Sequence, residues 1–145
     1  MITINPYLNF NGNCLEAFEF YREVFGGDTP YISRYKDMPA DSGHPLPEEL
    51  KELIMHMSLV HNPQAVLMGA DATQTFGGEV EFGSNISLMI NAQTKTEVDT
   101  IWAKLSAGAQ VTMPLQDVFW GDYFGMLTDK FGIYWMICCP SQKSE

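Results

Sequence analysis

The sequence has few cysteines, few basic residues and no long apolar run, and each shortage excludes a class of protein. Its three cysteines are Cys14, Cys138 and Cys139, an odd number without a CxxC pair. They predict neither a disulfide framework nor a zinc site, and they favour a reduced, cytoplasmic setting. No apolar run reaches the roughly 18 residues of a membrane-spanning helix. The first residues, MITINPYL, lack the basic and apolar regions of a signal peptide.

The shortage of basic residues argues against nucleic acid as a partner. Eight Lys and Arg stand against 18 Asp and Glu among 145 residues, so the formal net charge is −10. That charge repels phosphate backbones. A nucleotide-type cofactor is not expected either, because no glycine-rich strand-to-helix loop is followed by an acidic residue. We predict one domain over residues 1–145, without a cofactor.

The first half of the chain predicts a strand, a helix and three more strands. Residues 2–10 (ITINPYLNF) combine β-forming residues with polar alternation. Asn13, three residues before Glu16, is a suitable cap for a helix. The helix has apolar positions at helical spacing and ends at two glycines: Phe18, Tyr21, Phe25, Gly26 and Gly27. Further strands are expected at 29–35, 53–61 and 65–71.

The second half repeats this order. A strand at 84–91 precedes Thr94, and Glu97 three residues later completes a capping box. Asn5 to Phe18 and Asn85 to Val98 span the same thirteen positions. The remaining helix and strand signals follow in the same sequence as before: Val98, Ile101 and Leu105, then Gly108, then strands at 111–119, 123–129 and 133–139, with Asp129–Gly132 as the last turn.

These patterns predict an α+β fold of two βαβββ modules. The modules cover about 1–72 and about 83–140, and the glycine-rich segment of about 73–82 joins them. Because a strand in a sheet must bury one face, each helix is expected on the outer face of a curved mixed sheet. The opposite faces are then left to form a concave groove.

Three segments resemble a known family: PYLNFNGNCLEAFEFY, the stretch from His56 to MGAD, and FWGDYFGMLTDKFGIYW. With FYREVFGG in the first helix, the chain resembles the vicinal oxygen chelate superfamily, and within it the PhnB-like branch. That superfamily includes glyoxalase I, extradiol dioxygenases and bleomycin-resistance proteins. The resemblance implies the glyoxalase-like fold and a homodimer, but the fold hosts several unrelated functions. Some branch members are labelled ubiquinone-precursor methyltransferases, which the missing glycine-rich loop does not support.

The resemblance also implies where a metal would bind. Metal-dependent members carry one ligand on the first strand of each module and a glutamate on the last. The matching positions here are Asn5 (or Pro6), Met68, Asn85 and Met136. Neutral amides and thioethers do not replace the carboxylates, imidazoles or thiolates that divalent metals need. We therefore predict that the protein binds no metal.

Strand alternation predicts which side chains line the groove. Polar or aromatic side chains on a face whose reverse is apolar suggest a small-molecule ligand there. Trp135 is expected on the opposite face, under the helix. The predicted ligand-binding residues are Asn5, Tyr7, Asn9, Asn85, Ser87, Trp120 and Tyr134.

His56 is the one histidine inside a predicted strand, and two roles are open to it. It could be a general base, or a structural histidine bonded across the sheet. His44 lies in a proline-rich loop, and His61 ends a predicted strand and starts a turn with Asn62 and Pro63, so both are expected to face solvent. Asp71 and Asp129 are expected to cap turns.

Two features near the N-terminal half complete the set of candidates. Cys14 opens a helix, and a small buried side chain is favoured there over a reactive thiol. The acidic, proline-rich segment 37–52 suggests a lid or dimer arm.

Three functions follow as hypotheses. The first is a metal-free small-molecule binding protein that works as a homodimer. The second is a lyase or isomerase of glyoxalase type with a displaced metal at His56 and a nearby carboxylate. The third is a protein-interaction module whose groove is filled by its own side chains.

Overall fold

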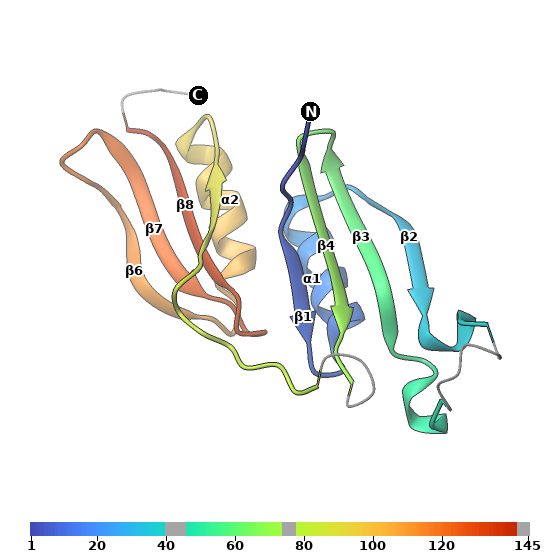
Figure 1. Ribbon diagram of the computed structural model, residues 1–145. Helices are drawn as coiled ribbons and strands as arrows, with labels where there is room; N and C mark the ends of the chain where they lie inside the picture. The colour runs from blue at the N-terminus through green and yellow to red at the C-terminus, as the bar shows by residue number, and fades with distance from the viewer. Residues whose placement is uncertain (40–45, 74–77, 142–145) are drawn as a thin grey trace. The chain divides into compact units, whose positions relative to one another are not determined.

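The computed structural model describes residues 1–39, 46–73 and 78–141 (Figure 1). The chain divides into two compact units, Met1–Glu81 and Phe82–Glu145. The predicted α+β arrangement of two βαβββ modules is confirmed, since each unit contains a strand, a helix and three further strands in that order. No helix among the described residues has the length and apolarity needed to cross a membrane.

The first unit is a four-stranded mixed sheet with one helix. Its strands lie in the order β1-β4-β3-β2, with β1 and β4 parallel and the other pairs antiparallel. Two short 3-10 helices follow β2. The elements are β1 (Tyr7–Phe10), α1 (Cys14–Phe25), β2 (Asp28–Arg34), η1 (Tyr35–Asp37), η2 (Glu48–Leu50), β3 (Ile54–Asn62) and β4 (Ala65–Asp71).

The second unit repeats this topology as a separate sheet. Its order is β5-β8-β7-β6, and β5 and β8 form the parallel pair. The mixed sheet predicted from the sequence is therefore two sheets of four strands. The elements are β5 (Leu88–Asn91), α2 (Lys95–Leu105), β6 (Gln110–Asp117), β7 (Asp122–Thr128) and β8 (Tyr134–Pro140).

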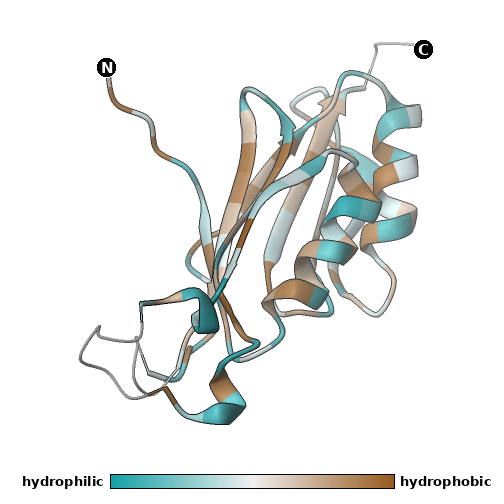
Figure 2. Cartoon of the chain, turned by 90° about the vertical axis from the view of Figure 1, so that its right-hand side faces the viewer, coloured by the Kyte–Doolittle hydropathy of each residue, from teal (hydrophilic) through white to brown (hydrophobic). Residues whose placement is uncertain are grey.

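The helix α1 packs on its sheet through an aromatic stripe. Phe18 is fully buried against Gly69 of β4, where an added Cβ would lie 2.6 Å from the Phe18 ring. Leu8 and Phe10 of β1 are buried on this same side. Hydrophobic and hydrophilic residues alternate along both helices (Figure 2), as expected for helices with one buried face.

The helix α2 covers the second sheet in the same way. Val98 contacts Ile137 and Cys139 in the core, and Trp102 packs over Gly125 of β7. Val98 has the same place in its module as Phe18, and both are fully buried. The thirteen-residue spacing in the sequence therefore corresponds to a repeated packing position.

Both first strands begin later than the sequence predicts. Strand β1 starts at Tyr7 instead of residue 2, because Pro6 accepts the last backbone bond, from the Met68 N–H, but has no N–H to continue the ladder. Strand β5 starts at Leu88 instead of residue 84. Leu88 pairs with Trp135, the second residue of β8, so in this register the residues before Ser87 have no residue of β8 beside them.

Candidate functional site

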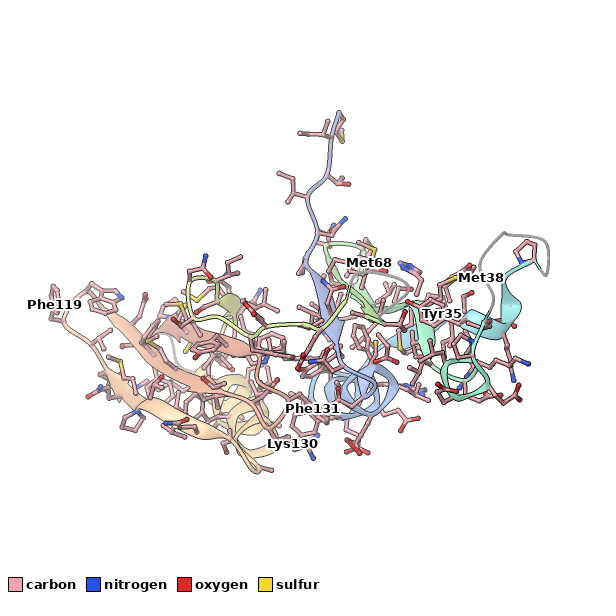
Figure 3. The ribbon with its side chains drawn as sticks, turned by 60° about the horizontal axis from the view of Figure 1, so that its bottom comes forward. Tyr35, Met38, Met68, Phe119, Lys130 and Phe131 are labelled. Carbon is pink, nitrogen blue, oxygen red and sulfur yellow. The ribbon has the colours of Figure 1, made fainter. Side chains whose placement is uncertain are left out.

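The face of the first sheet away from α1 carries a cluster of polar and aromatic side chains. Alternation along β1 turns Leu8 and Phe10 toward the helix and leaves Tyr7 and Asn9 on the other side. Figure 3 shows Met68 on this other side of the sheet. Cross-strand pairing extends the surface, which we call the His56 face: Tyr7, Asn9, Tyr31, His56, Ser58 and Met68.

His56 lies between two tyrosines on this face. The Tyr7 hydroxyl oxygen is 2.9 Å from His56 Nδ1, and the two ring centroids are 5.5 Å apart. The centroid of the Tyr31 ring, on the adjacent strand β2, lies 5.4 Å from that of the imidazole. Tyr7 and Tyr31 remain 42% and 54% exposed, so part of each ring is accessible to a ligand. Two roles were open to His56, a general base and a structural histidine. The structure shows the hydrogen bond across the sheet that the structural role requires.

The His56 face contains no carboxylate, lysine or arginine among the residues that define it. Partial burial raises the pKa of the Tyr7 phenol above its ordinary value, and the nearby Cys14 raises it further. Tyr7 therefore keeps its hydroxyl hydrogen at neutral pH. The face offers a phenol, an imidazole, an amide and a hydroxyl beside apolar and aromatic surface, which is the usual composition of a small-molecule site.

Asp71, the buried last residue of β4, has a structural role in this unit. Its buried carboxylate accepts hydrogen bonds from the backbone N–H groups of Gly12 and Cys14 at 3.0 and 2.9 Å, and of Ile54 at 2.9 Å. Asn13 occupies the N-cap position of α1, as predicted, but its side chain makes no capping hydrogen bond, and the Asp71 carboxylate accepts the Cys14 N–H at the helix N-terminus instead.

Cys14 is not a reactive thiol in this setting. It is fully buried, and this burial raises the pKa of its thiol well above the usual range. The Asp71 carboxylate raises that pKa further. Because the thiolate is the nucleophile, a raised pKa makes the thiol inert. The sequence favoured a small buried side chain over a reactive thiol at position 14, and Cys14 is buried in the structure.

Three predicted ligand residues lie outside the strands that were expected to orient them. Asn5 precedes β1, and Asn85 and Ser87 precede β5. Asn5 and Asn85 are exposed, and Ser87 is half-buried. The alternation argument therefore does not apply to these three residues, and their contact with a ligand stays a prediction.

The corresponding face of the second sheet is rich in sulfur and aromatic side chains. Tyr134 and Met136 lie on the side of β8 opposite Ile137, and Met136 pairs with Met89. Trp120 lies in the turn between β6 and β7, where it is 54% exposed and donates its Nε1–H to Asp122 at 3.1 Å. Its ring also meets Phe124 edge-on, with 5.8 Å between centroids.

Trp135 and Asp129 occupy the places predicted for them. Trp135 is buried on the same side of β8 as Ile137, and its Nε1–H donates to Asp129 at 2.8 Å. Asp129 also accepts the backbone N–H groups of Phe131 and Ile133, so it caps the β7–β8 turn. His61 is exposed. His44 lies outside the described residues, as does part of the predicted lid or arm at 37–52.

The sequence matches a family model over nearly its whole length. A model described as 3-demethylubiquinone-9 3-methyltransferase covers residues 2–138. Protein YjdN of Escherichia coli is 31% identical over 97% of both chains. This chain belongs to the PhnB-like family of the vicinal oxygen chelate superfamily.

Solved structures support the same relationship. Protein PA1353 from Pseudomonas aeruginosa matches this PhnB-like chain with a TM-score of 0.83 and 36% identity, over 97% of this chain and 98% of its own. A Bacillus cereus protein described as a putative 3-demethylubiquinone-9 3-methyltransferase, PhnB protein, matches with a TM-score of 0.73 and 26% identity, over 95% and 99% of the two chains.

The residues of this PhnB-like chain do not fit the metal that some proteins of the fold hold. The fosfomycin resistance protein FosX from Listeria monocytogenes, solved with Mn(II), shares the fold at 11% identity and a TM-score of 0.63, with 99% and 98% of the chains covered. Here Met68 and Met136 supply thioethers at two expected ligand positions, and Asn5 and Asn85 lie before their strands. Among the described residues, no three His, Cys, Asp or Glu side chains gather closely enough to hold an ion.

A nucleotide-type methyl donor does not fit the described residues either. Such cofactors bind through free backbone N–H groups at a helix N-terminus on a parallel sheet. At α1 the Asp71 carboxylate already occupies the N–H groups of Gly12 and Cys14. At α2 the Thr94 hydroxyl accepts the Glu97 N–H, and the Glu97 carboxylate accepts the Gln93 N–H. Each described sheet has a single parallel strand pair.

Proposed function

We propose that this protein is a metal-free small-molecule binding protein and that the His56 face is its principal ligand site. The observation that carries the proposal is the Tyr7–His56 hydrogen bond beside the exposed Tyr31 ring. Polar groups fixed by neighbours and surrounded by apolar surface are typical of ligand sites. Asn9 is the other predicted ligand residue on this face, and Tyr134 belongs to the corresponding face of the second sheet.

Exposure supports ligand binding over the interaction-module hypothesis. That hypothesis requires Tyr7, Met68, Met89 and Tyr134 to fill the surface with their own packing. Tyr7 and Met89 are instead 42% and 47% exposed. An exposed aromatic ring next to a fixed imidazole can still bury area against a ligand.

A thermal-shift screen tests the proposal. The library contains hydrophobic cations, uncharged aromatic compounds and sugars, each added to the full-length protein. A ligand at a hundred times its Kd stabilises the folded state by about 2.7 kcal/mol, which shifts the unfolding temperature by several degrees. No shift from any compound in a broad library would contradict the proposal.

Two variants localise any ligand that the screen finds. His56→Gln removes the imidazole and is expected to abolish the thermal shift at the same ligand concentration. Glu19→Gln is the matched control, because Glu19 is exposed on α1 and lies away from the His56 face. A ligand that binds His56→Gln unchanged would place the site elsewhere.

A lyase or isomerase role is the second candidate, favoured by the fixed orientation of the His56 imidazole. A general base needs such a partner to hold its ring. This candidate function includes a displaced metal held by His56 and a nearby carboxylate. Elemental analysis of the purified protein tests this, since stoichiometric nickel, zinc or iron that is lost in His56→Ala would replace the metal-free proposal.

We also propose that the protein works as a homodimer. The acidic segment 37–52 is the candidate arm, and Glu52 at its end binds Arg34 and Lys36 of the same chain at 3.5 and 2.8 Å. Sedimentation equilibrium at micromolar concentration should give twice the chain mass of 16.3 kDa. A single-chain mass would contradict this part of the proposal.

A further inference from the structure

We infer that Tyr7 donates its hydroxyl hydrogen to His56 Nδ1 and thereby fixes His56 as an Nε2–H donor, so that the site selects an uncharged, flat ligand with a hydrogen-bond acceptor. The inference rests on the proposed binding role of the His56 face. Tyr7 is then a positioning residue, because it acts through His56. The ligand class would be a conjugated ring that carries a carbonyl or similar acceptor.

The direction of the hydrogen bond follows from the chemistry of the two partners. The 2.9 Å contact joins a phenol oxygen and an imidazole nitrogen, and either could carry the hydrogen. A phenol is a strong donor, whereas its oxygen is a weak acceptor because its lone pair is shared with the ring. An unprotonated imidazole nitrogen is a strong neutral acceptor. The better-matched arrangement is the phenol O–H donating to Nδ1, which leaves the hydrogen of neutral His56 on Nε2.

The surroundings of His56 set the remaining ligand properties. The residues that define the His56 face include no ionised side chain, and the nearest ionisable residues on the paired strand, Arg34 and Asp28, lie opposite Ile54 and Val60 instead of opposite His56. A charged ligand would lose hydration without gaining a counter-charge, which is unfavourable. Tyr7 and Tyr31, with ring centroids 5.5 and 5.4 Å from the imidazole, offer partly exposed rings against which a flat ligand can stack.

Nitrogen NMR tests the tautomer without any ligand. Long-range proton–nitrogen spectra of the full chain, read at the high-pH plateau of a titration, distinguish the nitrogen that carries hydrogen. The chain has three histidines, so His56→Gln assigns the His56 signals. Exposed His61 reports the tautomer mixture of an imidazole on the protein surface.

Two tyrosine variants isolate the hydroxyl. Tyr7→Phe should move the His56 nitrogen shifts from nearly pure Nε2–H toward the His61 mixture. Tyr31→Phe removes a hydroxyl from the other ring beside His56 and should leave the tautomer unchanged. Hydrogen on Nδ1 in the wild type, or equal effects of the two variants, would overturn the inference. The wild-type spectrum decides the question even if Tyr7→Phe folds poorly.

Two one-ring probes test the ligand class. Acetophenone is uncharged and presents a carbonyl acceptor, whereas benzylamine is a cation near neutral pH. Acetophenone should shift the His56 Nε2 signal with an affinity about tenfold higher than benzylamine, because only the cation loses hydration without a counter-charge. Tighter benzylamine binding, or no shift with either probe, would overturn the ligand class. The wrong tautomer would leave the broader binding proposal standing, since the thermal-shift screen tests that separately.

Discussion

The two units of this protein share one topology but carry different chemistry on it. In the first unit, Asp71 pairs with Phe10 across the parallel strands and supplies a buried carboxylate. In the second unit, Ile137 pairs with Ile90 and belongs to the apolar core. The two helices are consequently capped differently, α1 by a distant carboxylate and α2 by its own Thr94. Packing positions are repeated between the units, whereas the polar groups are specific to each.

The surfaces away from the helices differ in the same way. The first unit places an imidazole between two phenols, and the second pairs Met89 with Met136 beside Tyr134. Thioethers are soft and adaptable apolar groups that neither donate strong hydrogen bonds nor transfer protons. We therefore expect directional recognition mainly in the first unit and largely apolar contact on the Met89–Met136 surface of the second.

The largest expected effect comes from removing the carboxylate that the second unit lacks. Asp71→Ala leaves three backbone N–H groups without their acceptor, so the free energy of unfolding should fall by about 3–5 kcal/mol. Urea unfolding followed by circular dichroism measures this change. Asp37→Ala is the control, because that exposed carboxylate accepts one N–H, from Arg34, and should cost about 1 kcal/mol or less. Equal losses in the two variants would contradict a special role for Asp71.

The next effect compares the glycines that lie beneath the two helices. Gly69→Ala would place a Cβ 2.6 Å from the Phe18 ring and 2.9 Å from the Leu8 carbonyl oxygen. At Gly125→Ala the nearest atoms would all belong to side chains, those of Trp102 and Leu115, at 2.8 and 2.9 Å. Both should destabilise by about 1–3 kcal/mol, with the larger loss at Gly69 because a backbone oxygen cannot rotate away. A larger loss at Gly125 in urea unfolding would reverse this ranking.

A smaller effect separates the two helix caps. Thr94→Ala removes the acceptor of the Glu97 N–H and should cost about 1 kcal/mol. Asn13→Ala should cost almost nothing, because the Asn13 side chain makes no capping bond. Thermal unfolding of both variants at one pH makes the comparison. A clear loss in Asn13→Ala would mean that the first helix also depends on its local cap.

The smallest effect is a pH dependence that belongs to the second unit. The hydrogen bond from the Tyr123 hydroxyl to Asp99, at 2.7 Å, raises the pKa of Tyr123 to about 12. A raised pKa in the folded state stabilises the protein below the unfolded value of about 10, and this contribution is lost as the pH rises toward 12. Tyr123→Phe should therefore reduce the fall in urea midpoint between pH 9 and pH 11. An unchanged fall would show that Tyr123 does not contribute.

Local sequence signals predicted the repeated part of the fold. The apolar spacing around Phe18 and Val98, the Thr94–Glu97 cap and the Asp129–Gly132 turn all depend on residues within a few positions of one another, and the structure contains each of them. Strand alternation also placed Tyr7 and Asn9 on the correct face of β1. These features were predictable because the residues that determine them are close in sequence.

The features that the sequence did not predict depend on distant residues. The Tyr7–His56 bond joins positions 49 residues apart, and no spacing rule connects them. The cap of α1 comes from Asp71, so Asn13 carried the right local signal without the role. The late start of β5 depends on where β8 begins, which the residues before Leu88 do not reveal.

The three bonds of Asp71 have a consequence for the order of folding. They join its carboxylate to Gly12, Cys14 and Ile54 across separations of 59, 57 and 17 residues. The carboxylate can be satisfied only after β3, β4 and the start of α1 have come together, so these bonds form after most of the unit's chain entropy is lost. Interactions that form late slow unfolding more than they speed folding. Asp71 therefore mainly slows the unfolding of the first unit, and its loss should appear mainly as faster unfolding.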